Sequence, residues 1–431
     1  MNGFGLSRER FALLFSVMLV AAAGNTAMQS LLPAIGRHLG VADLWVAIAF
    51  SLSAIAWVVM APVWARRADR RGRRALMRLG LIGFIVSMLI CGGALALGLA
   101  HMMGVTMVFA IFILGRSIYG IFGSASPSAV QAYVAARTDG EARTSALAVL
   151  ASSFGLGTII GPAIAPLFIF PPLGLSAPLI VFAGIGVLVL TGIVLRLPDD
   201  RPRNEATGPI VAYPSIGGSD AAPAAGEPAH MPTPLRWRDP RVLPWTIIGL
   251  VGGHGQAILL SVIGFLVIDR LHVPIVDAQH WIAIVLIAGA LASLLAQWGL
   301  IPRLGLSPRQ LVSWGSLVSA AGCVVTGLAE TAYGLILGFG LASLGFGLFR
   351  PGFTGGASLA VGLDEQNAVA GQVTSVNGMA YVAGPGLGVW IYGFGLPLPF
   401  LLTAALMTAL AVWTRFRLSP SGPAASASPA R

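Results

Sequence analysis

Long apolar segments follow one another along almost the whole chain and restrict how it can fold. A helix needs about 20 apolar residues to cross the hydrocarbon core of a bilayer. We count twelve such segments, at residues 11–32, 45–64, 79–100, 106–126, 146–168, 176–197, 243–268, 280–301, 311–328, 333–353, 368–392 and 396–416. The pattern predicts an all-α membrane protein with twelve transmembrane helices.

Composition supports a membrane protein and argues against a soluble one. Of the 431 residues, 56% are hydrophobic and 10% are charged, whereas about a quarter of a soluble domain is charged. The net charge of +10 raises the possibility of nucleic-acid binding. The basic residues flank apolar segments instead of forming a stripe, so the expected partner is the lipid bilayer and not nucleic acid.

The arginines predict how the chain is oriented. All 26 basic residues are arginine, and with twelve spans only Arg37 and Arg270 fall in outside loops. Arg116 and Arg350 lie within spans, and the other 22 lie on the inside. Because positive loops stay in the cytoplasm, both termini are expected there, in a multi-pass inner-membrane protein. Residues 8–23 could also be read as a secretory signal, but the apolar run continues to Leu32, which favours a retained helix.

The spans form two halves with a break between them. Residues 198–241 are rich in Pro, Ala, Gly and charge, and therefore predict a flexible cytoplasmic linker between bundles at 1–197 and 242–417. Residues 418–431 are expected to be a disordered tail. Cys91 and Cys323 lie inside spans, so no disulfide is expected.

The halves resemble each other in sequence. Gly24-Asn25 corresponds to Gly253-His254, Gly120-Ile-Phe-Gly123 to Gly347-Leu-Phe-Arg350, and Gly161-Pro162 to Gly384-Pro385. The paired positions are offset by 229, 227 and 223 residues. Such a repeat predicts two pseudo-symmetric six-helix bundles that share a cavity near the bilayer midplane.

Three motifs in the first half follow recognisable sequence patterns. The loop 65–74 is similar to G-x-x-x-D-R-x-G-R-R, with alanine at the first glycine, and residues 299–305 are a degraded copy in the second half. Residues 115–120 are similar to R-x-x-Q-G, with tyrosine in place of glutamine, and residues 157–165 are similar to G-x-x-x-G-P-x-x-G, with alanine at the last position. Together these motifs resemble those of the major facilitator superfamily, in particular its twelve-span drug:proton antiporter branch.

The resemblance implies that the loop is a gate made of Asp69, Arg70, Gly72, Arg73 and Arg74. Asp69 would hold the end of one span to the other half while the transporter faces outwards. The alternative is that the arginines only fix topology. An exposed ion pair is worth less than about 1 kcal/mol, so a gate requires partly buried helix-end geometry. Gly72 offers the positive φ that a tight turn needs.

The small residues of the fifth span predict close helix packing. Gly157 and Gly161 are four residues apart and lie on one face, and Pro162 removes a backbone hydrogen bond and bends the helix. We expect this face to pack against the eighth span.

Polar residues embedded in the spans predict the pathway for substrate and protons. They are Asn25, Gln29, Arg116, Tyr119, His254, Gln256, Asn377 and Tyr381. A central arginine costs about 2.5–3.5 kcal/mol to insert, so Arg116 should face away from lipid, either in the cavity or in a structural pair between helices. His254 is either functional or bonded to a backbone carbonyl. Arg350 lies nearer the cytoplasmic end, where its side chain can snorkel.

No carboxylate lies in the middle of a predicted span. The cavity is therefore expected to be positive or neutral and to suit an anionic or zwitterionic small molecule. Proton coupling would run through His254 or through the Asp69 network. The sequence predicts proton-driven efflux of a small organic molecule, with no cofactor or metal. We expect the chain to act as a monomer. A metabolite importer or facilitator without proton exchange is the alternative, followed by a non-transporting receptor or scaffold. No nucleophile–base pair or phosphate loop indicates an enzyme.

Overall fold

The computed structural model describes residues 7–135, 137, 146, 150, 153, 156–198, 237–361 and 366–418. Nearly all of these residues are helical. Within these ranges the β-pairing is a single isolated bridge between Phe170 and Gly174. The prediction of an all-α protein is confirmed.

The described part of the first half contains eight helical elements. They are α1 (Arg8–His38), α2 (Asp43–Arg71), α3 (Arg73–Leu99), α4 (Val105–Ile118), the π-helix η1 (Tyr119–Gly123), α5 (Ala125–Ala135), a helix at Leu156–Phe168 whose last turn is η2 (Ala165–Phe168), and α7 (Ala177–Arg196). The fourth predicted span is thus α4, η1 and α5 in direct succession. Insertion of a π-turn is common near functional positions in helices.

The second half contributes α8 (Leu243–Leu271), α9 (Ile275–Leu294), the π-helix η3 (Leu295–Leu300), α10 (Ile301–Leu304), α11 (Pro308–Leu328), α12 (Ala332–Leu359), α13 (Gln366–Tyr392) and α14 (Leu398–Arg417). Ten helices of the described chain are long and apolar enough to cross a membrane. The other two predicted spans correspond to Leu156–Phe168 and α13, so each of the twelve predicted spans contains a helix.

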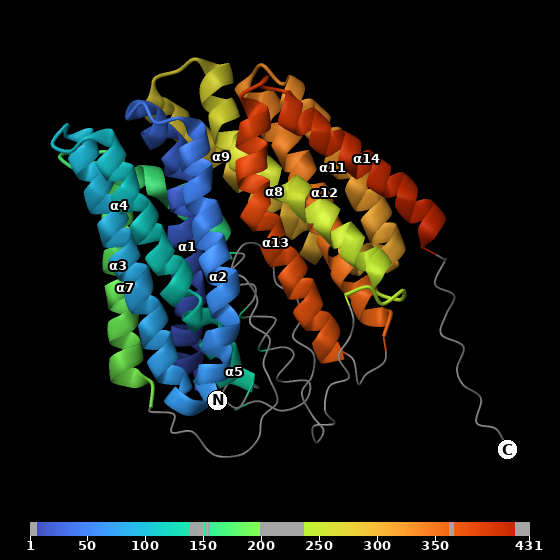
Figure 1. Cartoon of the computed structure of the whole chain (residues 1–431), viewed down its shortest axis with the longest axis horizontal. Helices are drawn as coiled ribbons and strands as arrows, with labels where there is room; N and C mark the ends of the chain where they lie inside the picture. Colours follow the sequence, from blue (N-terminus) through green and yellow to red (C-terminus); the bar gives the residue numbers. More distant parts are fainter. Residues whose placement is uncertain are drawn as a thin grey trace.

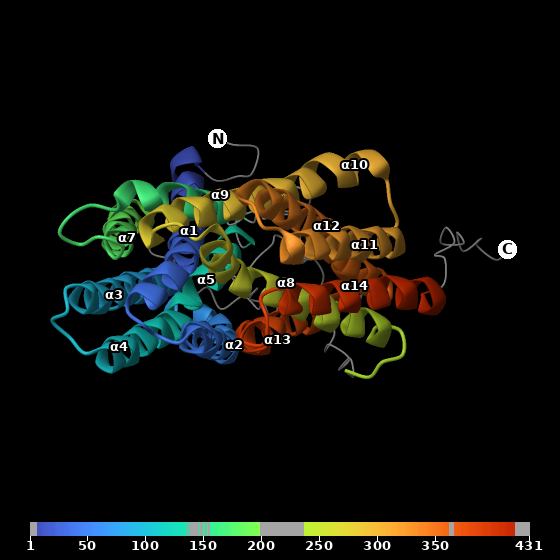
Figure 2. The same cartoon turned by 90° about the horizontal axis from the view of Figure 1, so that it is seen from above.

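The helices gather in two groups, α1–α7 and α8–α14, which lie side by side (Figures 1 and 2). Between the groups, α2 packs against α13 and α1 packs against both α8 and α9. This arrangement is the expected pair of six-helix bundles. The predicted linker and tail fall largely outside the described residues.

The repeat seen in the sequence has a counterpart in the packing. A Cβ atom at Gly161 would meet the backbone of Ala23 in α1, and one at Gly384 in α13 would lie 2.5 Å from the Cβ of Ala257 in α8. The fifth helix therefore packs closely on the first, and the eleventh packs closely on the seventh. Corresponding helices make corresponding contacts in the two halves.

The turns after the second and eighth spans are also alike. Gly72, between α2 and α3, has φ of 84°, and Gly305, between α10 and α11, has φ of 55°. A side chain at either position would be strained, because L-residues rarely adopt positive φ. The loop that we predicted to need a glycine does place one in such a conformation.

Candidate functional site

A cavity of about 220 Å³ lies between the two groups of helices. Side chains from α1, α2 and the Leu156–Phe168 helix line it on one side, and side chains from α8, α9, η3, α12 and α13 line it on the other. Five of the predicted pathway and helix-packing residues line this cavity: Asn25, Gln29, Pro162, Gln256 and Tyr381. Both halves therefore contribute polar groups to one shared space.

Arg350 carries the only charge among the described residues that line the cavity. It lies in α12, is 9% exposed, and interacts electrostatically with Tyr381 of α13. The buried hydroxyl oxygen of Tyr381 has no hydrogen-bond partner among the described residues. We expected Arg350 to snorkel towards the membrane surface, and this expectation was wrong because the side chain turns into the bundle. The sequence feature that could have indicated this inward position is the location of Arg350 within an apolar span.

Arg116 lies behind the cavity wall and not in it. The residue is 3% exposed, and its guanidinium carbon lies 4.8 Å from the ring centroid of Phe50 and 5.2 Å from that of Tyr119. Its Nη2 donates a 3.1 Å hydrogen bond to the side-chain oxygen of Asn25. Asn25 and Phe50 line the cavity, so Arg116 contacts two residues of the wall from behind.

The remaining lining combines aromatic rings with neutral polar groups. Phe50, Phe265, Phe339, Phe346 and Trp298 supply the rings, and Ser261, Ser293, Ser343 and Gln297 supply hydroxyl and amide groups. None of these residues was singled out from the sequence, because apolar and small polar residues occur in every span. A mostly apolar cavity with a few placed polar groups is typical of small-molecule sites.

Three further predicted pathway residues do not line the cavity: Tyr119, His254 and Asn377. The Nδ1 of His254 lies 2.7 Å from the backbone oxygen of Leu250, one turn earlier in α8. This is the backbone-bonded arrangement that we considered as the alternative to a functional histidine. Asn377 is 8% exposed, and its amide nitrogen has no hydrogen-bond partner among the described residues.

The glycines of the fifth span pack on α1, so our expectation that they pack against the eighth span was wrong. A Cβ atom at Gly157 would lie 2.5 Å from the backbone oxygen of Leu19, and one at Gly161 would meet Ala23. The Oγ1 of Thr26 also donates to the backbone oxygen of Gly157 over 3.4 Å. Small residues let the helix approach α1 at backbone distance, while Pro162 faces the cavity.

The predicted gate residues lie at the junction of α2 and α3. Asp69 and Arg70 belong to the last turn of α2, but their side chains lie outside the described part of the structure. Arg73 and Arg74 begin α3, and Arg74 donates to the backbone oxygen of Val194 in α7 of the same half. This bond between Arg74 and Val194 is made within the first half.

Among the described residues, no group of three or more His, Cys, Asp or Glu side chains could hold a metal ion. Cys91 and Cys323 are free thiols buried in different halves.

The chain was compared with known proteins by sequence. It is 22% identical to multidrug resistance protein 1 of Bacillus subtilis (strain 168), over 93% of this chain and 95% of that protein. It is 26% identical to multidrug resistance protein MdtL of Klebsiella pneumoniae (strain 342), over 88% and 86%. The match to the staphyloferrin B transporter of Staphylococcus aureus (strain NCTC 8325 / PS 47) is 27% identical but spans 43% of this chain and only 41% of that protein.

Solved structures share the fold. A bacterial homologue of the human lysosomal transporter Spinster, inward-facing and unoccupied, superposes with a TM-score of 0.68 at 12% identity, covering 96% of both chains. The human organic anion transporter MFSD10 (TETRAN) has a TM-score of 0.62 at 19% identity, covering 95% of this chain and all of that chain.

The family model described as Major Facilitator Superfamily matches residues 14–306, more than half of the chain. Members of this family are membrane transporters and not enzymes. With two six-helix bundles around a shared cavity and this match, the chain belongs to the Major Facilitator Superfamily.

Proposed function

We propose that the chain exports small organic anions across the inner membrane by alternating access, with the proton gradient as the energy source. The observation that carries the proposal is Arg350, the only charged side chain among the described residues lining a cavity shared by both halves. The multidrug resistance proteins among its relatives support export.

The electrostatics of the cavity favour an anion. A positive charge in a low-dielectric site attracts an anionic group strongly, and Arg350 supplies such a charge to the cavity lining. The guanidinium of Arg350 and the hydroxyl of Tyr381 can both donate hydrogen bonds to a carboxylate, sulfonate or phosphate. A lipophilic cation would meet a like charge. A zwitterion also fits this site when a neutral amide such as Gln29 accepts hydrogen bonds from its ammonium group.

The rings around the cavity suit an organic body on that anion. Phe50, Phe346 and Trp298 can pack against an apolar or aromatic skeleton, while Arg350 fixes one end. An amphipathic anion therefore fits better than an inorganic one. The cavity is contained within one chain, which fits a monomeric transporter that needs no cofactor.

The arginine distribution supports the orientation. We infer that the end of the bundle carrying Gly72 faces the cytoplasm, with both termini, and that the end carrying Arg37 faces outwards. Export then requires the cavity to load from the Gly72 end and to empty at the Arg37 end.

Proton coupling has two candidate routes, His254 and the Asp69 network. The alternative function is a metabolite importer or facilitator without proton exchange. It is favoured by one observation: His254 is bonded to its own helix and is not part of the described cavity lining.

Flux into inverted membrane vesicles tests the proposal. The probe is 1-naphthalenesulfonate, which is amphipathic and stays anionic, and the comparison cation is tetraphenylphosphonium. We expect the sulfonate to accumulate only when a pH gradient is imposed, and the Arg350→Gln variant to lose this uptake. Arg303→Gln is the matched control, because Arg303 bonds to the backbone oxygen of Gly299 outside the cavity. Uptake of the cation by the wild type, or sulfonate uptake by Arg350→Gln, would overturn the anion proposal; uptake without a gradient would favour the facilitator.

A further inference from the structure

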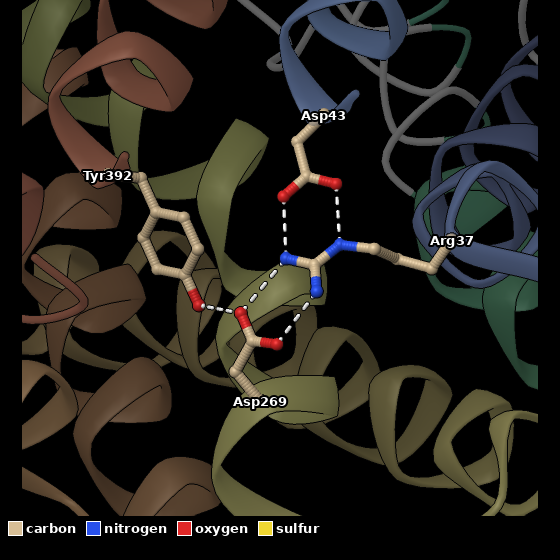
Figure 3. A network of polar contacts seen from close by, with 4 residues as sticks. All are labelled: Arg37, Asp43, Asp269 and Tyr392. Atoms are coloured by element: carbon tan, nitrogen blue, oxygen red, sulfur yellow. Dashed lines mark hydrogen bonds and ion pairs between the residues drawn. The ribbon is translucent and has the colours of Figure 1, made fainter. Parts of the chain in front are cut away.

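A polar network of four residues joins the two halves at the end of the bundle opposite Gly72 (Figure 3). Arg37 lies in the last turn of α1 and Asp43 begins α2, both in the first half. Asp269 and Tyr392 lie at or near the ends of α8 and α13 in the second half. We propose that this network is the latch that holds the outer face closed, and that the contact between Arg37 and Asp269 is the part that breaks when the outer face opens. The inference rests on the proposed alternating access.

The geometry pairs one guanidinium with two carboxylates. Arg37 donates from Nε and Nη2 to Asp43, over 2.6 and 2.5 Å, and from Nη1 and Nη2 to Asp269, over 2.9 and 3.0 Å. Figure 3 shows the Arg37 guanidinium lying between the two acids. Bidentate, charge-assisted pairs of this kind are among the stronger hydrogen bonds in proteins, and they fix orientation. The latch therefore sets how the two halves meet as well as how strongly.

Each half keeps its own part of the network in order. Asp43 holds Arg37 from within the first half, and the Tyr392 hydroxyl donates to Asp269 over 2.6 Å within the second. When the halves separate, the Arg37–Asp43 and Tyr392–Asp269 contacts can persist, and only the contact between Arg37 and Asp269 is lost. Because both partners stay positioned, the latch can close again with little ordering of side chains.

The surroundings make the pair more than a surface contact. The side chain of Arg37 is 31% exposed and that of Asp269 is 21% exposed. The guanidinium carbon of Arg37 also lies 5.6 Å from the ring centroid of Phe265, which lines the cavity. Partial burial against an aromatic ring reduces the solvent screening that makes exposed ion pairs weak.

Further contacts join α1 to the second half. Gln279 of α9 donates to the hydroxyl of Ser30 in α1 over 3.3 Å, and both residues are fully buried. A Cβ atom at Gly264 of α8 would lie 2.7 Å from Pro33 of α1, and both of these residues line the cavity. The latch thus covers a tightly packed seal at one end of the cavity, so breaking it bears directly on access.

The neighbouring arginine provides a matched control. Arg270 follows Asp269 in α8, and its polar contacts among the described residues are made to second-half groups: the backbone oxygen of Gly327 at 3.2 Å and the carboxylate of Glu330 at 3.9 Å. Neutralising Arg270 therefore removes a charge at the same membrane depth without removing a bond between the halves.

The test measures access to the cavity without any substrate. Ser261 lines the cavity, and Ser261→Cys provides a single reactive thiol because Cys91 and Cys323 are buried. Intact cells are treated with a membrane-impermeant maleimide, and inverted vesicles with the same reagent report the cytoplasmic side. The amount of inserted protein is quantified for each variant.

In this background we expect Asp269→Asn to raise the outside labelling rate about tenfold, because the cross-half pair is lost. Asp269→Glu should stay near the parent rate and Arg270→Gln should match it. Arg37→Gln should behave like Asp269→Asn, and the double variant should add little to either, as expected for two ends of one contact.

Equal outside labelling of Asp269→Asn and Arg270→Gln would overturn the latch, as would a rise only on the cytoplasmic side. Because labelling needs no substrate, failure of sulfonate export with intact labelling changes would overturn the proposed function and leave the latch standing.

Discussion

Arg116 donates its Nη2 hydrogen bond to the side-chain oxygen of Asn25, at 3.1 Å, from a position behind the cavity wall. The oxygen of Asn25 is thereby occupied, and its amide nitrogen is left as the group that can donate. A donor on the wall complements an anion in the cavity. Arg116 is thus a positioning residue that acts through Asn25.

We predict that Arg116→Gln raises the KM for sulfonate export about tenfold, because Asn25 loses the partner that fixes its orientation. The control is Ser117→Ala, since the Ser117 hydroxyl donates to the backbone oxygen of Ile113 in its own helix. Vesicle uptake at graded probe concentrations measures KM and maximal rate separately. An unchanged KM with a lowered amount of inserted protein would instead make Arg116 purely structural.

Tyr381→Phe should weaken anion binding without weakening the fold. The Tyr381 hydroxyl is buried beside Arg350 and has no hydrogen-bond partner among the described residues, so its removal breaks no described bond. We expect the KM for the sulfonate to rise about threefold to tenfold and the melting temperature to stay unchanged or to rise. A lowered melting temperature with unchanged KM would contradict this role.

The large-scale fold could be predicted because it follows from one-dimensional patterns. Apolar runs of the right length give the helices, and the spacing of pairs such as Gly161-Pro162 and Gly384-Pro385 gives the repeat. The same reasoning placed Asn25, Gln29, Gln256 and Tyr381 in the cavity, because polar groups in apolar spans avoid lipid.

The remaining details depend on helix rotation and pairing, which periodicity leaves open. Whether Arg350 snorkels or turns inward is decided by the rotation of α12 against its neighbours. The partner of Gly161 is α1 because of how the fifth helix crosses the first. The latch was missed because Arg37 and Asp269 are 232 residues apart and each looks like an ordinary loop-end charge.

Gly161→Ala should destabilise the protein, because the added methyl group would meet the backbone of Ala23 in a contact that α1 cannot easily relax. Overpacking of this kind costs about 1–3 kcal/mol. Gly184→Ala in α7 is the matched control, since a Cβ atom there meets nothing within 4 Å. Thermal unfolding in detergent should show a lower melting temperature for Gly161→Ala only. Equal melting temperatures would refute close packing at this position.

His254→Ala decides between the two proton routes. If the imidazole carries the coupling, uptake of sulfonate driven by a pH gradient should fall to the level measured without a gradient, while exchange of sulfonate between preloaded vesicles persists. His272→Ala is the control, because His272 lies at the end of α8 and is exposed. Gradient-driven uptake that survives His254→Ala would eliminate this route and leave the Asp69 network.

Asp69→Asn should leave the protein inserted and reduce the maximal transport rate by at least about tenfold, if Asp69 holds the inner gate. The variant keeps the size of the side chain and removes only the charge, so insertion should be unaffected. Asp239→Asn is the control. Arg241 bonds to Asp239 and lowers the pKa of its carboxyl, so the control also removes a real charge, one that lies before α8 and away from the α2–α3 turn. Transport assayed in vesicles with equal amounts of each variant distinguishes a gating role of Asp69 from a general effect of charge. A normal rate for Asp69→Asn would reduce the loop to a topology signal, whereas loss in both variants would point to the total charge of the inner face and not to a gate.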